Sequence, residues 1–144
     1  YRVGGILTER VIVKGKTGGY DLIDIESMKR VKFLRTSRND KMEKIGSYSI
    51  FPAALDLGRK ILCRGSTGTI TVIDEVGRLE LEGRGWSDCL SFLLARDEGI
   101  LILAVRDTFL EEVISKWELT DYTVINVSSG SAEEAFELIR DPVI

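Results

Sequence analysis

The first third of the chain alternates between apolar and polar residues and is punctuated by glycine. This alternation predicts half-buried strands over residues 3–13, 20–25 and 31–34. The polar, glycine-rich segment at residues 14–19 is typical of the turn of an antiparallel hairpin. Pro52 stands at a possible first helical position, and the apolar residues after it predict a short helix over residues 51–62.

The second half of the chain replaces alternation with continuous apolar runs, which are typical of parallel strands buried on both faces. These runs lie at residues 70–73, 100–105 and 122–127. Helical patterns follow each run, with start signals at Ser87 and in two segments of capping-box form, Thr108–Glu111 and Ser131–Glu134. The order of strands and helices predicts right-handed crossovers and a three-layer α/β fold, with a parallel sheet extended by the N-terminal hairpin.

Composition narrows the chemistry that the chain can perform. The 144 residues suffice for one domain with its own core, and a formal charge of −3 provides no basic field for holding nucleic acid. The absence of histidine removes the commonest general base, and Cys63 and Cys89 fit no metal-ligand spacing and are too few for a disulfide framework. No apolar run reaches the roughly 18 residues that a membrane helix needs. We therefore expect a cytoplasmic protein that has neither nucleic acid nor a membrane as partner.

Two acidic residues follow the apolar run at residues 70–73. Asp74 and Glu75 are expected at the carboxyl edge of a parallel sheet, where open α/β folds bind ligands. This is the arrangement of a Walker B element, in which the aspartate helps to hold Mg²⁺ and the next glutamate orients or deprotonates the water that attacks a γ-phosphate. The alternative is that the two acids stand there only because the strand leaves the core.

The segment Gly15-Lys16-Thr17 matches the last three positions of a phosphate-binding loop. The full pattern requires glycine at position 10, where Arg10 stands, and such a loop must open a helix rather than an alternating strand. We therefore predict a hairpin turn here. No other match to the pattern occurs in the 144 residues.

Four segments together form a more specific pattern. They are Gly5-Ile6-Leu7-Thr8-Glu9-Arg10, Gly19-Tyr20-Asp21, Ile45-Gly46-Ser47-Tyr48 and Val72-Ile73-Asp74-Glu75-Val76-Gly77-Arg78-Leu79-Glu80-Leu81. The last segment extends the acidic pair by Gly77 and by Glu80-Leu81, which a generic Walker B element does not require. On these segments the chain resembles, over most of its length, the cancer-related nucleoside-triphosphatase family, which consists of small P-loop proteins similar to nucleotide kinases.

The resemblance implies a Mg²⁺-dependent enzyme that hydrolyses nucleoside triphosphates such as ATP or GTP. Asp74 would bind the metal and Glu75 would activate the water. In the family, a Walker A loop and a first helix precede the segment where this chain begins, and the chain starts at Tyr1 rather than at Met. We expect residues 1–144 to form a single, N-terminally incomplete P-loop NTPase-like domain that lacks the first strand and the P-loop helix. The isolated chain is then expected to be inactive.

Arg106 ends the run at residues 100–105, on the same predicted sheet edge as Asp74. It would contact phosphate or transition-state charge, or else form a salt bridge with a neighbouring acid. Thr8 and Glu9 would contact nucleotide or support the metal site, although an exposed strand end explains them nearly as well.

Trp86 belongs to the segment Gly83-Arg84-Gly85-Trp86, which leads into a predicted helix. The two glycines would let the backbone approach a nucleotide base on which Trp86 stacks. The alternative is a tight loop with Trp86 packed beneath it.

Two other functions are compatible with the sequence. One is a nucleotide or nucleoside kinase on the same scaffold, and the other is a degenerate α/β interaction module that keeps the acids without catalysis. For the nucleoside-triphosphatase and for the kinase, the partner is a nucleoside triphosphate. We expect the protein to be a monomer.

Overall fold

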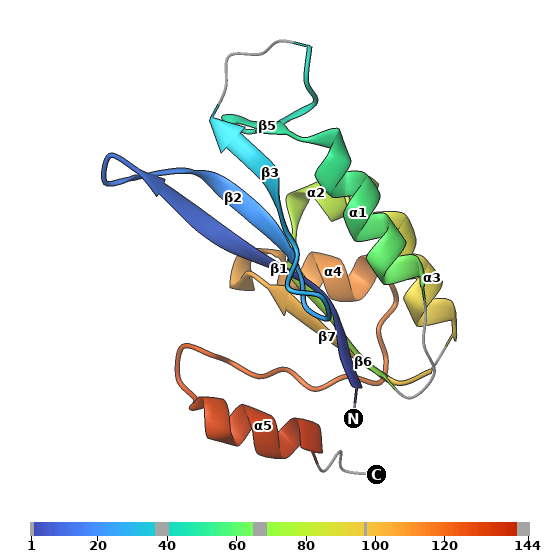
Figure 1. Ribbon diagram of the computed structural model, residues 1–144. Helices are drawn as coiled ribbons and strands as arrows, with labels where there is room; N and C mark the ends of the chain where they lie inside the picture. The colour runs from blue at the N-terminus through green and yellow to red at the C-terminus, as the bar shows by residue number, and fades with distance from the viewer. Residues whose placement is uncertain (1, 37–40, 65–68, 97, 141–144) are drawn as a thin grey trace.

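The computed structural model describes residues 2–36, 41–64, 69–96 and 98–140 (Figure 1). Within these residues the centre is a seven-stranded mixed sheet with the order β4-β5-β3-β2-β1-β6-β7. The strands are β1 (Arg2–Val13), β2 (Lys16–Asp24), β3 (Arg30–Thr36), β4 (Lys44–Ile45), β5 (Tyr48–Ile50), β6 (Thr69–Val76) and β7 (Ile100–Val105). The pairs β1–β6 and β6–β7 are parallel, whereas the strands on the other side of β1 pair antiparallel. The predicted α/β class with an antiparallel hairpin extension is confirmed.

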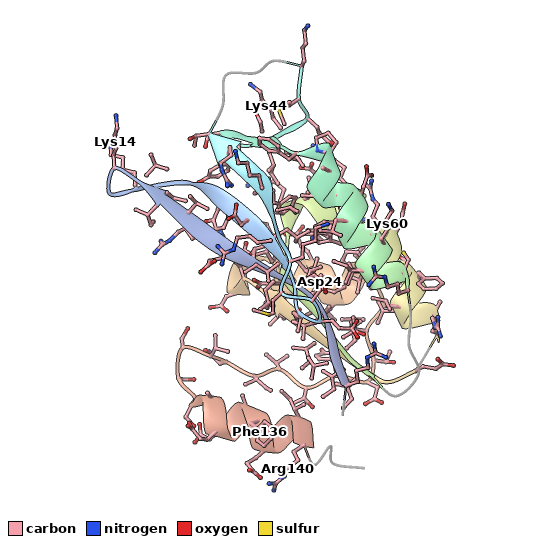
Figure 2. The ribbon with its side chains drawn as sticks, in the orientation of Figure 1. Lys14, Asp24, Lys44, Lys60, Phe136 and Arg140 are labelled. Carbon is pink, nitrogen blue, oxygen red and sulfur yellow. The ribbon has the colours of Figure 1, made fainter. Side chains whose placement is uncertain are left out.

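The connection between β1 and β2 is a tight hairpin turn at Lys14 and Gly15. Both residues have positive φ angles, 49° and 76°, as a two-residue turn of this type requires. Lys16 and Thr17 already belong to β2. The segment that mimics the end of a phosphate-binding loop is therefore part of a hairpin, as predicted, and Lys14 marks its tip (Figure 2).

The helical elements are α1 (Pro52–Cys63), α2 (Arg78–Leu81), α3 (Ser87–Arg96), the 3-10 turn η1 (Asp107–Phe109), α4 (Leu110–Lys116) and α5 (Ala132–Arg140). None of these described helices is long and apolar enough to cross a membrane. Pro52 stands at the start of α1, as predicted. At α5 the backbone N–H of Ser131 donates to Oε2 of Glu134 at 2.9 Å and the N–H of Glu134 donates to Oγ of Ser131 at 3.1 Å, which is the predicted capping box.

The capping box predicted at Thr108–Glu111 is wrong. The chain forms the 3-10 turn η1 at this point, and α4 follows from Leu110 without a side-chain cap. Thr108 lies inside that turn, so its hydroxyl is not placed before the first helical residue, where a cap must stand.

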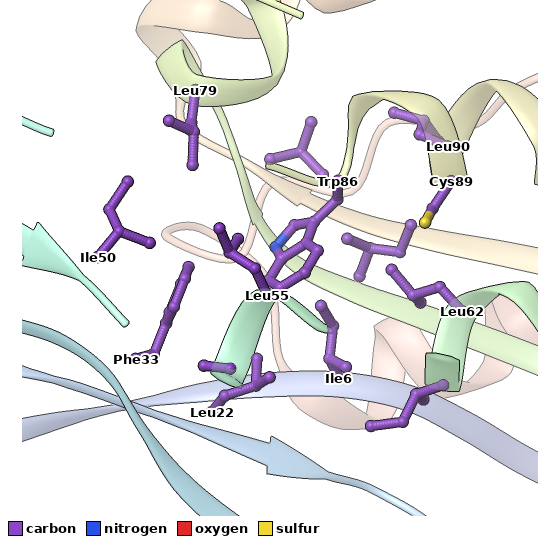
Figure 3. Close-up of a cluster of buried hydrophobic side chains, with 14 of the residues drawn as sticks. Ile6, Leu22, Phe33, Ile50, Leu55, Leu62, Leu79, Trp86, Cys89 and Leu90 are labelled. Atoms are coloured by element: carbon purple, nitrogen blue, oxygen red, sulfur yellow. The ribbon is translucent and has the colours of Figure 1, made fainter. Parts of the chain in front are cut away.

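The hydrophobic core lies between the sheet and the helices α1 and α3. Helix α1 packs across β1, β2 and β3 and contacts α3 (Figure 1). Trp86 is at the centre of the buried cluster, near Leu55 and the ring of Phe33, whose centroid is 5.5 Å away (Figure 3). A Cβ atom at Gly58 of α1 would lie 2.4 Å from Cη2 of Trp86, so only glycine fits this close approach.

The strand predicted over residues 122–127 is wrong. This segment has no regular secondary structure, and Val124 and Val127 are 53% and 84% exposed. Among the described residues β7 is the last strand on its side of the sheet, and the segment does not pair with it. A high β-propensity orders a strand only where a neighbour supplies hydrogen bonds and packing. Helix α5, which follows, stands apart from the sheet and buries none of its side chains (Figure 1).

The two cysteines lie in contact where α1 and α3 meet. Their Sγ atoms are 3.2 Å apart, and both are free thiols, Cys63 exposed and Cys89 buried. Burial, followed by the contact with Cys63, raises the pKa of the Cys89 thiol to about 12. Sequence spacing gave no sign of this contact, because the two residues belong to different helices.

Candidate functional site

Asp74 lies at the carboxyl end of β6, where it meets β1. The parallel register pairs Ile6 with Ile73, so Thr8 comes alongside the end of β6. Oδ2 of Asp74 accepts hydrogen bonds from both the backbone N–H and the hydroxyl of Thr8, each at 3.0 Å. These two bonds fix the orientation of the carboxylate. Thr8 and Asp74, both singled out from the sequence, are thus brought together.

Glu75 has an unusual backbone conformation at this edge of the sheet. Its φ angle is 60°, in the left-handed region that residues other than glycine rarely adopt. Such a conformation costs on the order of 1–3 kcal/mol and is found mostly at functional sites. The chain therefore turns sharply after Asp74, and the carboxylate of Glu75 is half exposed.

Arg106, at the end of β7, faces Glu75. The distance from Nη2 of Arg106 to Oε2 of Glu75 is 3.9 Å, and the two side chains are 69% and 46% exposed. An ion pair this exposed stabilises a fold by less than about 1 kcal/mol. The predicted meeting of Arg106 with the acids at one sheet edge is therefore observed, and the contact between them is weak.

These residues border a cavity with a volume of about 610 Å³, a size typical of small-molecule sites. Thr8, Asp74, Glu75 and Arg106 line it from the neighbouring strands β1, β6 and β7. From the strands on the other side of β1, namely β2, β3, β4 and β5 with the turn before β5, the lining residues are Tyr20, Phe33, Leu34, Ile45, Ser47 and Tyr48. The cavity thus combines charged groups with an apolar, aromatic wall.

Glu80 holds together the loop that follows the acids. This residue is 2% exposed. Its Oε2 accepts the backbone N–H of Gly77 at 3.0 Å and its Oε1 accepts that of Trp86 at 3.2 Å. Burial raises the pKa of Glu80, an effect that the two backbone hydrogen bonds partly offset. A Cβ at Gly85, where φ is 57°, would lie 2.3 Å from Oε1, so the loop closes around the carboxylate only with glycine there.

Two predicted site residues take other places. Trp86 borders the cavity, but its ring is 1% exposed and packs against Phe33 and Gly58, as the alternative of a tight loop over a packed tryptophan requires. Glu9 forms an ion pair with Arg30 and is not among the residues that line the cavity. Neighbouring strand residues point to opposite faces, so Thr8 and Glu9 cannot both face one site. Because Thr8 and Glu9 are neighbours in a predicted strand, the sequence alone already indicates that only one of them can belong to the site.

The donor set at Asp74 is compatible with Mg²⁺. Among the residues that the structure describes, no group of three His, Cys, Asp or Glu side chains lies close enough to hold a metal ion by itself. Mg²⁺ usually keeps several waters and is bound by one or two carboxylates together with substrate phosphates. A single oriented carboxylate beside an open cavity fits that mode of binding, in which the metal arrives with a phosphate group.

Comparisons with known sequences point to one family. A family model described as NTPase matches residues 1–139 of the chain. The nucleoside-triphosphatase THEP1 of Methanocaldococcus jannaschii is 26% identical over 146 residues, which cover 100% of this chain and 81% of that protein. The nucleoside-triphosphatase THEP1 of Methanothermobacter thermautotrophicus is 29% identical over 126 residues, covering 86% and 71%.

Solved structures with the same fold carry related names. The crystal structure of THEP1 from the hyperthermophile Aquifex aeolicus matches with a TM-score of 0.71 at 19% identity, over 99% of this chain and 82% of that one. The solution structure of a human cancer-related nucleoside triphosphatase matches with a TM-score of 0.62 at 19% identity, over 96% and 78%. The predicted fold class, a P-loop NTPase-like α/β sheet, is confirmed by these likenesses.

Proposed function

The chain belongs to the NTPase family, whose model matches residues 1–139, and from this premise we propose that it is a Mg²⁺-dependent nucleoside-triphosphatase that releases the γ-phosphate of its substrate. One observation carries the proposal. The carboxylate of Asp74 accepts two hydrogen bonds from Thr8, lies next to Glu75 with its left-handed backbone, and borders a cavity of about 610 Å³. The names of the sequence relatives support the same activity.

Asp74 would hold Mg²⁺, which neutralises charge on the phosphates when it is bound. Both hydrogen bonds from Thr8 go to one oxygen of the carboxylate, Oδ2. They hold the group in one orientation before substrate arrives, so no ordering is required at the moment of reaction. Thr8 is therefore a positioning residue, and its removal would act through Asp74.

Glu75 would orient the attacking water and accept its proton. In a regular strand these two neighbours would point to opposite faces of the sheet. The left-handed backbone at Glu75 interrupts that alternation, and both carboxylates line the cavity. Arg106 would face the charge that develops on the γ-phosphate. Because its contact with Glu75 is exposed and 3.9 Å long, the guanidinium can turn to a phosphate at little cost.

The 144 residues contain no phosphate-binding loop pattern, which is the usual cradle of the triphosphate. We therefore expect residues 1–144 alone to bind a triphosphate weakly.

The test is phosphate release from ATP and GTP by the full-length protein over a range of Mg²⁺ concentrations. Asp74→Asn keeps the acceptor for Thr8 but loses the charge, so it should require far more Mg²⁺ or lose activity. Asp88→Asn, at an exposed position in α3, serves as the matched control. Hydrolysis without Mg²⁺, or an unchanged Mg²⁺ requirement in Asp74→Asn, would contradict the proposal. Transfer of phosphate to a nucleoside or nucleotide rather than to water would select the kinase alternative.

A further inference from the structure

The end of the cavity away from the acids is built from aromatic and aliphatic side chains. Tyr20 and Tyr48 form an edge-to-face pair with ring centroids 5.9 Å apart and an interplanar angle of 75°. Both tyrosines line the cavity and are only partly buried. Part of each side chain is therefore accessible from the cavity.

The strand register explains why these rings gather on one face of the sheet. Tyr20 pairs with Leu34, which pairs with Ile50, and Tyr48 stands two residues before Ile50. Residues two apart share a face, so the tyrosines lie on the same side of the sheet and meet above β3. A register shift between Tyr20 and Asp21 leaves Phe33 without a partner in β2. Such a bulge re-aims side chains, and both Phe33 and Leu34 line the cavity.

The aromatic end is close to the acidic end. Tyr20 pairs with Arg10, which is two residues along β1 from Thr8, the residue that holds Asp74. Roughly 7 Å along the strand and one strand spacing of about 5 Å therefore separate the backbone of Tyr20 from that of Thr8. One ligand can extend from the tyrosines to the acids.

We propose that the tyrosine pair, Tyr20 with Tyr48, is a nucleobase subsite; its connection to phosphate chemistry rests on the proposed function. The lining residues that come from β2, β3, β4, β5 and the turn before β5 carry no charge, whereas the charged lining residues all lie in β6 or later in the chain. This favours a neutral group over a second phosphate beside the tyrosines. Two partly exposed rings inclined at 75° to each other offer one face for stacking and one edge for contact, and tyrosine hydroxyls can form hydrogen bonds. Stacking accepts any base, because every base has a flat π-face. The base belongs either to the hydrolysed triphosphate or to a second nucleoside that lies next to it.

The first experiment measures the binding of adenosine and guanosine, which carry no phosphate, to the full-length protein by calorimetry. Tyr48→Ala should weaken binding by about tenfold or more, as expected for the loss of one stacking ring, whereas Tyr48→Phe should retain most of it. Tyr122→Ala removes a tyrosine that is 49% exposed and outside the cavity, and it should bind as the wild type does. Tyr20→Leu is the second test variant, and thermal unfolding checks that each variant is folded.

A second measurement identifies the source of the base. A raised KM for triphosphate hydrolysis by Tyr48→Ala, with kcat unchanged, would assign the subsite to the base of the triphosphate. Unchanged hydrolysis together with lost nucleoside binding would assign it to a second nucleoside. Both results support the subsite. It is overturned if nucleosides fail to bind the wild type, or bind both tyrosine variants as tightly as the wild type. A wild type that binds nucleosides but hydrolyses no triphosphate would contradict the proposed function alone.

Discussion

Alanine at position 58 should destabilise the protein, although in most helices the same change is stabilising. Gly58 lies inside α1, where alanine is normally favoured over glycine by about 1 kcal/mol. In this helix the added Cβ would lie 2.4 Å from Cη2 and 2.5 Å from Cζ3 of Trp86. Carbon atoms cannot approach so closely, so either the helix or the indole ring must move.

The surroundings of Trp86 set the size of the effect. The ring is held by Phe33 and by the buried aliphatic side chains around it (Figure 3). Overpacking of such a core costs about 1–3 kcal/mol. The clash involves two ring atoms of a buried indole, so the upper part of this range, about 2–3 kcal/mol, applies here. After subtraction of the gain of about 1 kcal/mol in helix propensity, we expect Gly58→Ala to lower the free energy of unfolding by about 1–2 kcal/mol. For a domain of this size that corresponds to a fall in Tm of roughly 2–8 °C.

Thermal and urea unfolding followed by circular dichroism measure this change. Asp56→Ala, at an exposed position of the same helix, is the matched control and should stay within about 0.5 kcal/mol of the wild type. An unchanged or raised Tm for Gly58→Ala would refute the reasoning. It would mean that the indole moves without cost, and Trp86 would again be a candidate for stacking on a nucleotide base.

Two further predictions concern buried titratable groups. Burial raises the pKa of Glu80 in the folded chain above 4.5, its usual value. Between the unfolded-state pKa and the higher folded-state pKa, the folded chain holds a proton that the unfolded chain has lost, so the free energy of unfolding falls as pH rises. Urea unfolding should show this decline in the wild type relative to Glu80→Gln, which cannot titrate; parallel pH profiles would contradict it. The thiol of Cys89 is buried and has a pKa of about 12, so iodoacetamide should alkylate only Cys63 in the folded protein. Mass spectrometry measures the labelling. Equal labelling of both cysteines would be inconsistent with the packing of α1 on α3.

The parts of the fold that the sequence predicted are those that local chemistry decides. The Lys14–Gly15 turn follows from residues that tolerate positive φ, and the start of α1 follows from Pro52. The position of Asp74 follows from a buried run that ends in two acids, because the carboxyl ends of parallel strands share one edge. Each of these features needs only a few neighbouring residues.

The errors arose where a local sequence pattern did not decide the local structure. Residues 122–127 have the composition of a buried strand, but β7 does not pair with them, so they stay exposed. The segment at Thr108 has the letters of a capping box, but the chain turns through η1 at that point. The sequence does not show that residues 122–127 lack a pairing neighbour, nor that a 3-10 turn replaces the capped helix start at Thr108.

The site residues that the sequence did not assign depend on tertiary structure. Tyr20 and Tyr48 come from strands separated by β3, so only the register shows that their rings meet. Glu80 belongs to the extended acidic segment on which the family resemblance rests, but its role appears only when two backbone N–H groups close on its carboxylate.

The most direct test of the proposed mechanism is γ-phosphate release by Glu75→Gln in the full-length protein, measured together with the binding of a non-hydrolysable ATP analogue. The account predicts a rate lower by a factor on the order of 10² to 10⁴, the usual contribution of a general base, with analogue binding nearly unchanged. Glu112→Gln, an exposed carboxylate in α4, should behave as the wild type. Full activity in Glu75→Gln would contradict the assignment of the water-activating role to Glu75.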